Sequence, residues 1–292
     1  MADISKAVLI TGCSSGIGEA TATHLCARGF TVYATARRPE TIEHLRKLGC
    51  QTLALDVTDE NSMRAAVSTV EEREGAVGVL INNAGYSQSG AIETVPLEDV
   101  RRQFETNVFG LVRMCQLVLD KMRVQGYGKI VNVSSMGANF TFPGGGFYHS
   151  SKYALEAISD ALRFEVKGFG VDVIVVQPGL ILTRFGEAAS SSMDLISSSP
   201  SAPSENGADP YANFNTTVAK RTRDVYDNPL MARVGGPPLA VAKKVERAIT
   251  ARRPKTRYRV TVSAPLLITQ RKLLSDRMWD RMMASQFPRP GR

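Results

Sequence analysis

The sequence contains few residues of the kinds that bind metal ions or form disulfides. Its 292 residues include three histidines and four cysteines. The histidines are too widely scattered along the chain to form a metal site: His24, His44 and His149. The cysteines have neither metal-ligand spacing nor an evident pairing, so we expect four free thiols packed in the interior: Cys13, Cys26, Cys50 and Cys115. Neither a metal centre nor a disulfide is predicted.

Long apolar runs are also lacking. No run approaches the ~20 residues that cross a bilayer. No basic segment precedes the first expected strand at residues 7–11, so the pattern of a secretory signal is not met. We therefore expect a cytoplasmic protein.

The positive charge of the chain is unevenly placed. The net charge is +8, and from Lys243 onward fourteen Lys or Arg stand against three acidic residues. No nucleic-acid recognition motif accompanies these basic residues. Nucleic-acid binding is therefore not predicted.

Residues 264–292 are predicted to form a basic amphipathic helical extension. Apolar side chains lie along approximately one helical stripe: Leu267, Leu274, Met278, Met282 and Met283. Such a stripe packs more often on its own domain or on a second subunit than on an anionic membrane surface. Protein packing is favoured, with peripheral membrane contact as the alternative.

Short runs rich in Val and Ile alternate with helical patterns along the rest of the chain. The runs predict strands at 7–11, 31–36, 51–56, 77–81, 129–133, 171–176 and 257–262. Helices are expected at 16–28, 40–48, 60–74, 97–124, 148–167 and 239–251. This alternation is typical of a doubly wound α/β Rossmann fold, with a central parallel sheet of about seven strands flanked by helices. We expect one such domain over residues 1–263, in which the irregular stretch 185–236 forms a substrate lid, with plain disorder as the alternative.

A tyrosine and a lysine four residues apart carry the chemistry of the chain. Tyr148 and Lys152 fall on one face of an expected helix, so the phenol and the ammonium lie close together. A tyrosine has a pKa of ~10, and a neighbouring cation lowers it. Ser135 lies thirteen residues upstream at the end of a strand, and Asn107 precedes it. A lowered pKa would suit Tyr148 to general acid and base chemistry, and the alternative for the Tyr148 and Lys152 pair alone is a chance spacing on a solvated helix face.

A glycine-rich segment predicts a bound dinucleotide. Gly12, Gly16 and Gly18 follow the first strand and open a helix, where unpaired N–H groups hold a pyrophosphate. The second strand ends in Arg37 and Arg38, where an NAD enzyme usually places an acidic residue. Unless both arginines are merely solvated, NADP(H) is favoured over NAD(H).

Taken with the Asn-Asn-Ala-Gly segment at 82–85, these features resemble the short-chain dehydrogenase/reductase family over about residues 5–185. The long lid and the C-terminal extension look like its 17β-hydroxysteroid and retinol dehydrogenase branch. The resemblance implies that Tyr148 is the general acid/base and that Ser135 hydrogen-bonds the substrate oxygen. Lys152 would lower the pKa of Tyr148 and hold the nicotinamide ribose, and Asn107 would hold a water leading to Lys152. Ser134 is a rival for Ser135.

The resemblance also implies a set of residues that contact the dinucleotide. Asp56 and Val57 would border the adenine, and Ile181 and Thr183 would contact the nicotinamide. The full set is Gly12, Ser14, Ser15, Gly16, Ile17, Gly18, Arg37, Asp56, Val57, Asn83, Ala84, Gly85, Tyr148, Lys152, Pro178, Gly179, Ile181 and Thr183.

The function expected from the resemblance is hydride transfer between NADP(H) and a carbonyl or secondary alcohol. The substrate would be bulky and apolar: a steroid, a retinoid or a lipid-like molecule. Several phenylalanines are candidates to line its pocket: Phe140, Phe142, Phe147, Phe185 and Phe214. Two alternatives stay open, a 3-oxoacyl-type reductase acting on thioesters and a non-catalytic NADP(H) sensor that acts through a protein partner. A homodimer or homotetramer is expected.

Overall fold

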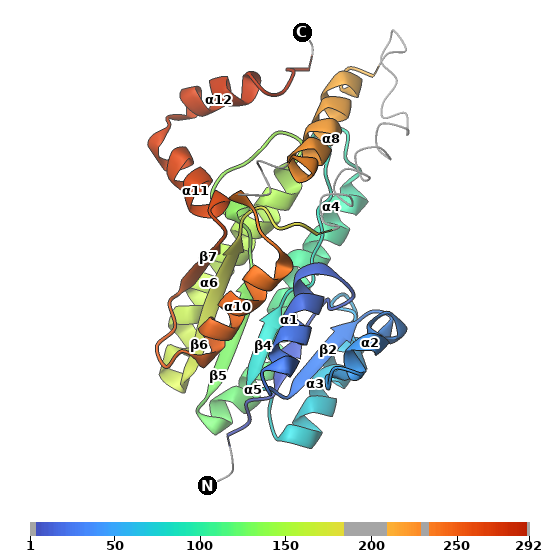
Figure 1. Ribbon diagram of the computed structural model, residues 1–292, viewed down its shortest axis with the longest axis vertical. Coiled ribbons are helices and arrows are strands. Elements are labelled where there is room, and N and C mark those ends of the chain that lie inside the picture. The colour runs from blue at the N-terminus through green and yellow to red at the C-terminus, as the bar shows by residue number, and fades with distance from the viewer. Residues whose placement is uncertain (1–3, 184–208, 229–233, 291–292) are drawn as a thin grey trace.

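A computed structural model describes residues 4–183, 209–228 and 234–290 of the chain. Its centre is one sheet of seven parallel strands in the order β3-β2-β1-β4-β5-β6-β7 (Figure 1). The strands are β1 (Val8–Ile10), β2 (Val32–Ala36), β3 (Gln51–Ala54), β4 (Val79–Asn82), β5 (Gly128–Val133), β6 (Val171–Pro178) and β7 (Arg257–Val260). The expected doubly wound α/β fold is confirmed.

Helices cover both faces of this sheet. The helices of the described residues are α1 (Gly16–Ala27), α2 (Glu43–Arg46), α3 (Glu60–Glu74), α4 (Leu97–Phe104), α5 (Gly110–Gln125), α6 (Gly146–Val166), α8 (Ala212–Asp227), α10 (Pro238–Thr250), α11 (Ser263–Leu273) and α12 (Asp276–Ala284). Helices α1 and α10 pack on one face, and α3, α5 and α6 pack on the other (Figure 1). Among the described residues, no helix is both long and apolar enough to cross a membrane.

The alternation of side chains along the strands builds two cores. In β1, Val8 and Ile10 belong to the core beneath α1 and α10, whereas Leu9 belongs to the core beneath α3, α5 and α6. Successive side chains of a strand point to opposite faces, so a strand covered on both faces is apolar throughout. All three side chains are fully buried.

Local signals fix several helix ends. Asp59 caps α3, because its carboxylate accepts hydrogen bonds from the backbone N–H groups of Asn61 and Ser62 at 2.8 and 3.1 Å. Gly126 ends α5 in the left-handed conformation, with φ of 67°. The single helix expected over 97–124 is divided into α4 and α5 by a π-helical turn at Glu105–Phe109.

The C-terminal extension forms two helices, α11 and α12. Trp279 and Met283 of α12 are buried against Phe140 and Met136, which follow β5. The indole Nε1 of Trp279 also donates a hydrogen bond to the carbonyl oxygen of Thr141 at 3.3 Å. Most of the apolar stripe therefore contacts the chain's own domain, whereas Met278 is 51% exposed. Of the stretch expected to form a lid, residues 185–208 and 229–233 lie outside the described residues.

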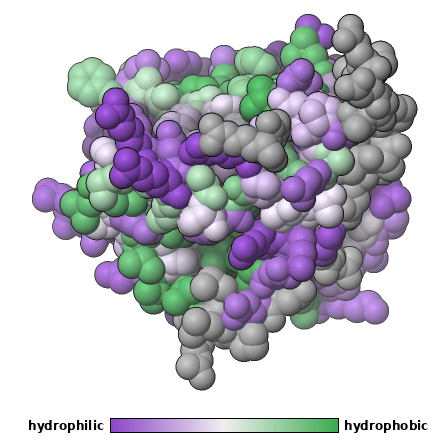
Figure 2. Space-filling view, turned by 90° about the horizontal axis from the view of Figure 1, so that it is seen from above, coloured by the Kyte–Doolittle hydropathy of each residue, from purple (hydrophilic) through white to green (hydrophobic). Residues whose placement is uncertain are grey.

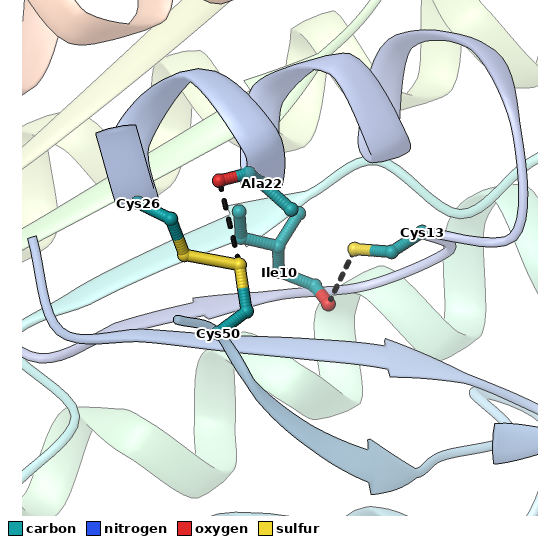
Figure 3. Close-up of a disulfide and its surroundings, with 5 residues drawn as sticks. All are labelled: Ile10, Cys13, Ala22, Cys26 and Cys50. Carbon is teal, nitrogen blue, oxygen red and sulfur yellow. Dashed lines mark hydrogen bonds between the residues drawn. A yellow bond between two sulfur atoms is a disulfide. The ribbon is translucent and has the colours of Figure 1, made fainter. Parts of the chain in front are cut away.

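The expectation of four free thiols is wrong for one pair. Figure 3 shows a disulfide between Cys26, near the end of α1, and Cys50, just before β3, whose Cα atoms lie 5.9 Å apart. The sequence did not reveal this pair because its members are 24 residues apart and meet only through the packing of α1 beside α2 and the turn before β3. Cys13 and Cys115 are buried free thiols, and burial raises the pKa of each to about 12.

Reduction of this disulfide should lower the stability of the protein. A crosslink that closes a loop of this length lowers the conformational entropy of the unfolded chain. This effect stabilises the folded state by about 3 kcal/mol. We expect the free energy of unfolding, measured in urea, to fall by about that amount when a reductant is added. The Cys50→Ser variant should have the lower stability with or without reductant. Equal stability of the oxidised and reduced wild-type protein would contradict the prediction.

Candidate active site

A cavity of about 1170 Å³ opens at the carboxyl ends of the strands. The strand order reverses between β1 and β4, and ligands of open α/β sheets bind outside such a reversal. Every residue expected to contact the dinucleotide lines this cavity except Gly18. Ser135, Tyr148 and Lys152 line it as well, whereas Asn107 does not.

The glycine-rich turn after β1 is tied to the end of β4. The hydroxyl oxygen of Thr11 accepts hydrogen bonds from the backbone N–H groups of Asn83 and Ala84, both at 3.0 Å. The amide Nδ2 of Asn83 donates to the carbonyl oxygens of Thr11 and Gly12 at 3.0 and 2.9 Å. Gly12 has φ of 73°, and a Cβ placed there would lie 2.8 Å from Cα of Ala84. The close approach of these two segments requires glycine.

The N-terminus of α1 fits the pyrophosphate of a dinucleotide. Ser15 is the N-cap residue, and its side chain makes no capping hydrogen bond. The first N–H groups of a helix lack partners within the helix and carry its positive dipole end. Gly16, with φ of 63°, lines the cavity beside Thr183. A side chain at position 16 would fill part of this cradle.

Basic side chains stand where the adenosine end of the ligand would lie. Arg37 lines the cavity at the end of β2, whereas its neighbour Arg38 does not. Arg102 of α4 lines the cavity too, although no motif in the sequence singled it out. Burial raises the pKa of Tyr86, and the charge and hydrogen bond of Arg102, followed by the charge of Arg37, oppose that rise. Arg37 and Arg102 therefore act on the same part of the cavity.

Tyr148 and Lys152 stand together on the first turns of α6. The Nζ atom of Lys152 lies 5.9 Å from the centre of the Tyr148 ring. The same Nζ atom donates a hydrogen bond to the carbonyl oxygen of Val133 at 2.9 Å. Burial lowers the pKa of Lys152 to about 8, and this group therefore keeps most of its charge at neutral pH.

A carboxylate one turn further along α6 supports the charge of Lys152. The charge of Glu156 raises the pKa of Lys152 and so opposes the effect of burial. Glu156 is itself held by Gln177 of β6 and by Arg257 of β7, each at 2.9 Å. Arg257 also pairs with Asp160 at 2.7 Å. This network connects the last strand of the sheet to Lys152.

Asn107 lies in the π-helical turn and holds the loop that follows β4. Its Nδ2 atom donates to the carbonyl oxygen of Tyr86 at 2.9 Å and to the hydroxyl of Ser151 at 3.0 Å. Its Oδ1 atom accepts from the backbone N–H of Tyr86 at 3.1 Å. A Cβ on Gly85 would lie 3.0 Å from this Oδ1 and 3.7 Å from Nζ of Lys152. Asn107 therefore lies close to Lys152, and its role in holding a water stays a prediction.

The remaining walls of the cavity are largely apolar. Phe140 and Phe142 line it as expected, whereas Phe147 and Phe214 pack in other clusters and Phe185 lies outside the described residues. The sequence did not single out the lining residues contributed by α8 and by the chain after α12: Val218, Arg221, Thr222, Val225, Gln286 and Phe287. Figure 2 shows the surface at the end of the molecule that carries α8 and α12, where hydrophobic residues lie between strongly hydrophilic ones.

Phe287 connects two of these walls. It packs on the cluster around Phe140 and Trp279 and also on the cluster around Phe214 and Val218 of α8. Phe287 lies 147 residues beyond Phe140 in the sequence, so only the fold brings them together. The chain after α12 thus helps to enclose the cavity.

Comparison with known proteins gives the family. Residues 6–194 match the family model described as short chain dehydrogenase. The NADPH-dependent 3-dehydrocapnine reductase of Ornithobacterium rhinotracheale is 33% identical over 285 residues, 94% of each chain. The 3-ketodihydrosphingosine reductase of Bacteroides thetaiotaomicron is 45% identical over 178 residues, 61% of this chain and 65% of that protein. A short-chain dehydrogenase from Streptomyces avermitilis has a crystal structure that matches with a TM-score of 0.75 and 30% identity, over 97% of this chain and 95% of that one. With the fold and the residues around the cavity, these matches show that the chain belongs to the short-chain dehydrogenase/reductase family of oxidoreductases.

Proposed function

We propose that the protein transfers a hydride between NADP(H) and a carbonyl or secondary alcohol on a bulky, lipid-like substrate. One observation supports this most directly: a single cavity is lined by Arg37 at one end, by Ser135, Tyr148 and Lys152, and by apolar side chains of α8 and the C-terminal segment. In such an arrangement the nucleotide site and the apolar substrate site meet next to the acid/base group Tyr148.

The chain's own residues provide the proton and stabilise charge on the substrate oxygen. A bound nicotinamide would supply the hydride in reduction and take it in oxidation. Tyr148 donates a proton to the carbonyl oxygen in the reducing direction and accepts it back in the other. Ser135 accepts a hydrogen bond from the N–H of Gly137 at 3.0 Å, which leaves its hydroxyl hydrogen to be donated to the substrate oxygen. The ammonium of Lys152 favours the phenolate form of Tyr148.

The substrate class rests on the walls and on the relatives. Phe142, Val218 and Phe287 offer an apolar surface, and Arg221 adds one basic group from α8. The names of the two curated relatives specify reduction of a 3-keto or 3-dehydro group. We infer a ketone carried on a long apolar chain or ring system, with a thioester-bound 3-oxoacyl group as the alternative.

Turnover should be tested with purified protein and a panel of ketones. Loss of NADPH would be followed with 3-ketodihydrosphingosine, a steroid ketone, a long-chain aliphatic ketone and a 3-oxoacyl thioester. Turnover of any of the first three well above the thioester supports the proposal. If the thioester is preferred, the alternative reductase is correct. If NADPH binds tightly and no ketone is reduced, the sensor function gains support.

Cofactor preference should depend on Arg37 and not on Arg38. A charge-assisted hydrogen bond to the 2′-phosphate contributes about 1.5–3 kcal/mol, which corresponds to roughly 10- to 100-fold in affinity. The Arg37→Asp variant should lose that factor in kcat/KM for NADPH and change little with NADH. Arg38→Asp is the matched control, because Arg38 is exposed and does not line the cavity. An equal loss in both variants would show a diffuse charge effect, and an unchanged Arg37→Asp variant would remove the basis for NADP preference.

A further inference from the structure

The residue after Tyr148 is a histidine whose ring lies beneath the active site. His149 is buried on the first turn of α6 and lines the cavity. Its ring packs against Phe140 and Phe142 at centroid distances of 6.2 and 6.1 Å, and against Tyr148 at 5.7 Å. Sequence position alone suggests a packing or lining residue, but its nitrogen atoms have specific partners.

Both ring nitrogens are hydrogen-bonded to one segment of backbone. Nδ1 lies 2.7 Å from the carbonyl oxygen of Gly137, and the N–H of Phe142 points to Nε2 at 3.3 Å. A carbonyl oxygen only accepts, so Nδ1 carries the proton and Nε2 is the acceptor. These two bonds require a neutral imidazole in one tautomer. Burial lowers the pKa of His149 and favours that neutral form.

The segment held in this way connects the two catalytic elements. Ser135 ends the strand region, and the N–H of Gly137 donates to its hydroxyl oxygen at 3.0 Å. Phe142 forms part of the apolar wall, and α6 with Tyr148 begins four residues later. The imidazole therefore joins the chain just after Ser135 to the residue next to Tyr148.

The segment is shaped around the ring. A Cβ on Gly137 would lie 2.6 Å from Nδ1 of His149, and a Cβ on Gly145 would lie 2.9 Å from its Cδ2 atom. An apolar residue of similar size would fill the space but would leave the carbonyl of Gly137 and the N–H of Phe142 unpaired. Each unpaired buried group costs about 1–3 kcal/mol, so the segment would move to find other partners.

We propose that His149 is a positioning residue, which fixes the distance between Ser135 and Tyr148 by binding the backbone at Gly137 and at Phe142. The expected effect on kcat rests on the proposed function. The expected effect on the backbone between Ser135 and Tyr148 does not. A displacement of about 1 Å between catalytic groups costs up to ~100-fold in rate. Binding of NADPH should change little, because most of its expected contacts lie on other elements and Lys152 is also held by the carbonyl oxygen of Val133.

Three variants at position 149 separate hydrogen bonding from packing. His149→Leu keeps volume and loses both bonds. His149→Asn places an amide near Nδ1, where it can donate to Gly137, and His149→Gln places an amide oxygen near Nε2, where it can accept from Phe142. Ser150→Ala is the control, because the exposed hydroxyl of Ser150 bonds only within its own helix, to the carbonyl of Phe147.

The variants should differ in kcat and in the hydrogen exchange of residues 136–142. We expect His149→Leu to lower kcat by about 10- to 100-fold with an NADPH Kd within about twofold of wild type. The backbone amides of residues 136–142 should exchange faster, and the Asn and Gln variants should be intermediate in both measurements. If the Leu variant does not fold, the two amide variants against wild type provide the same comparison.

Two outcomes would overturn the role of His149. The first is a Leu variant with wild-type kcat and wild-type exchange. The second is a set of amide variants no better than Leu, because the hydrogen bonds would then contribute nothing. The exchange measurement needs neither cofactor nor substrate. Absence of turnover in the wild-type protein would therefore count against the proposed function, while exchange would still decide the role of His149.

Discussion

Replacing Tyr148 with phenylalanine should reduce kcat by about 1000-fold while NADPH binding stays within about threefold of wild type. The substitution removes one oxygen atom and keeps the ring that lies 5.9 Å from Nζ of Lys152. Without the phenol, the substrate oxygen must take its proton from water. Steady-state kinetics with the best ketone and a direct NADPH titration would measure the two effects separately.

Tyr153 provides a matched control for this experiment. It lies five residues further along α6, and its side chain is 44% exposed. Tyr153→Phe makes the same chemical change on the same helix and should leave kcat within about twofold of wild type, as for surface substitutions away from specific features. If Tyr148→Phe kept more than a tenth of the wild-type kcat, another group would be the acid, and the assignment of Tyr148 would be wrong.

Replacing Gly18 with alanine should weaken NADPH binding severely, although Gly18 does not line the cavity. A Cβ at this position would lie 2.2 Å from the carbonyl oxygen of Gly12 and 2.6 Å from Nδ2 of Asn83. Gly12 and Asn83 take part in the hydrogen bonds that tie the glycine-rich turn to the end of β4. The N-terminus of α1 must therefore move away from that turn. We expect NADPH affinity to fall by at least about tenfold and stability by about 1–3 kcal/mol, as for other overpacked sites.

Gly168→Ala is the control, because it makes the same glycine to alanine change at a position where the added methyl group meets no neighbour. A Cβ there would meet no atom within 4 Å. Gly168→Ala should leave NADPH affinity and the urea midpoint unchanged. A Gly18→Ala variant with normal affinity would mean that α1 can shift without cost to the cofactor site.

The sequence predicted most of the elements that surround the cavity. Apolar runs of β-branched residues located the strands, and the Tyr148 and Lys152 spacing located the start of α6, because these signals are local. The predicted loops and element ends were less exact, because their positions depend on contacts between distant segments and not on local signals. The turn at Glu105–Phe109, for example, has the composition of an ordinary helix, and its π hydrogen bonding depends on how Asn107 is held by Tyr86 and Ser151.

Contacts between distant segments could not be predicted. The Cys26 and Cys50 pair meets through packing, and Phe287 reaches the cavity only because α11 and α12 fold back over the segment after β5. His149 was visible in the sequence, but its partners lie in an irregular stretch whose path no periodicity reveals. Residues that belong to a sequence motif were therefore found, and residues whose importance comes only from partners in distant segments were not.

The π turn marks a place where the chain could lose one residue without disturbing the helices on either side. A π turn contains one residue more than an α-helical turn, so deleting a residue within Glu105–Phe109 would let α4 and α5 join as one regular helix. The flanking residues would keep nearly the same faces, because only the extra residue of the turn is lost. Val100 and Gln103 of α4 would stay buried, whereas Asn107, which lies inside the turn, would leave Tyr86. Among homologous sequences, a gap of one residue at this place should accompany loss of the asparagine, whereas exposed positions such as Phe109 should vary without any change in length.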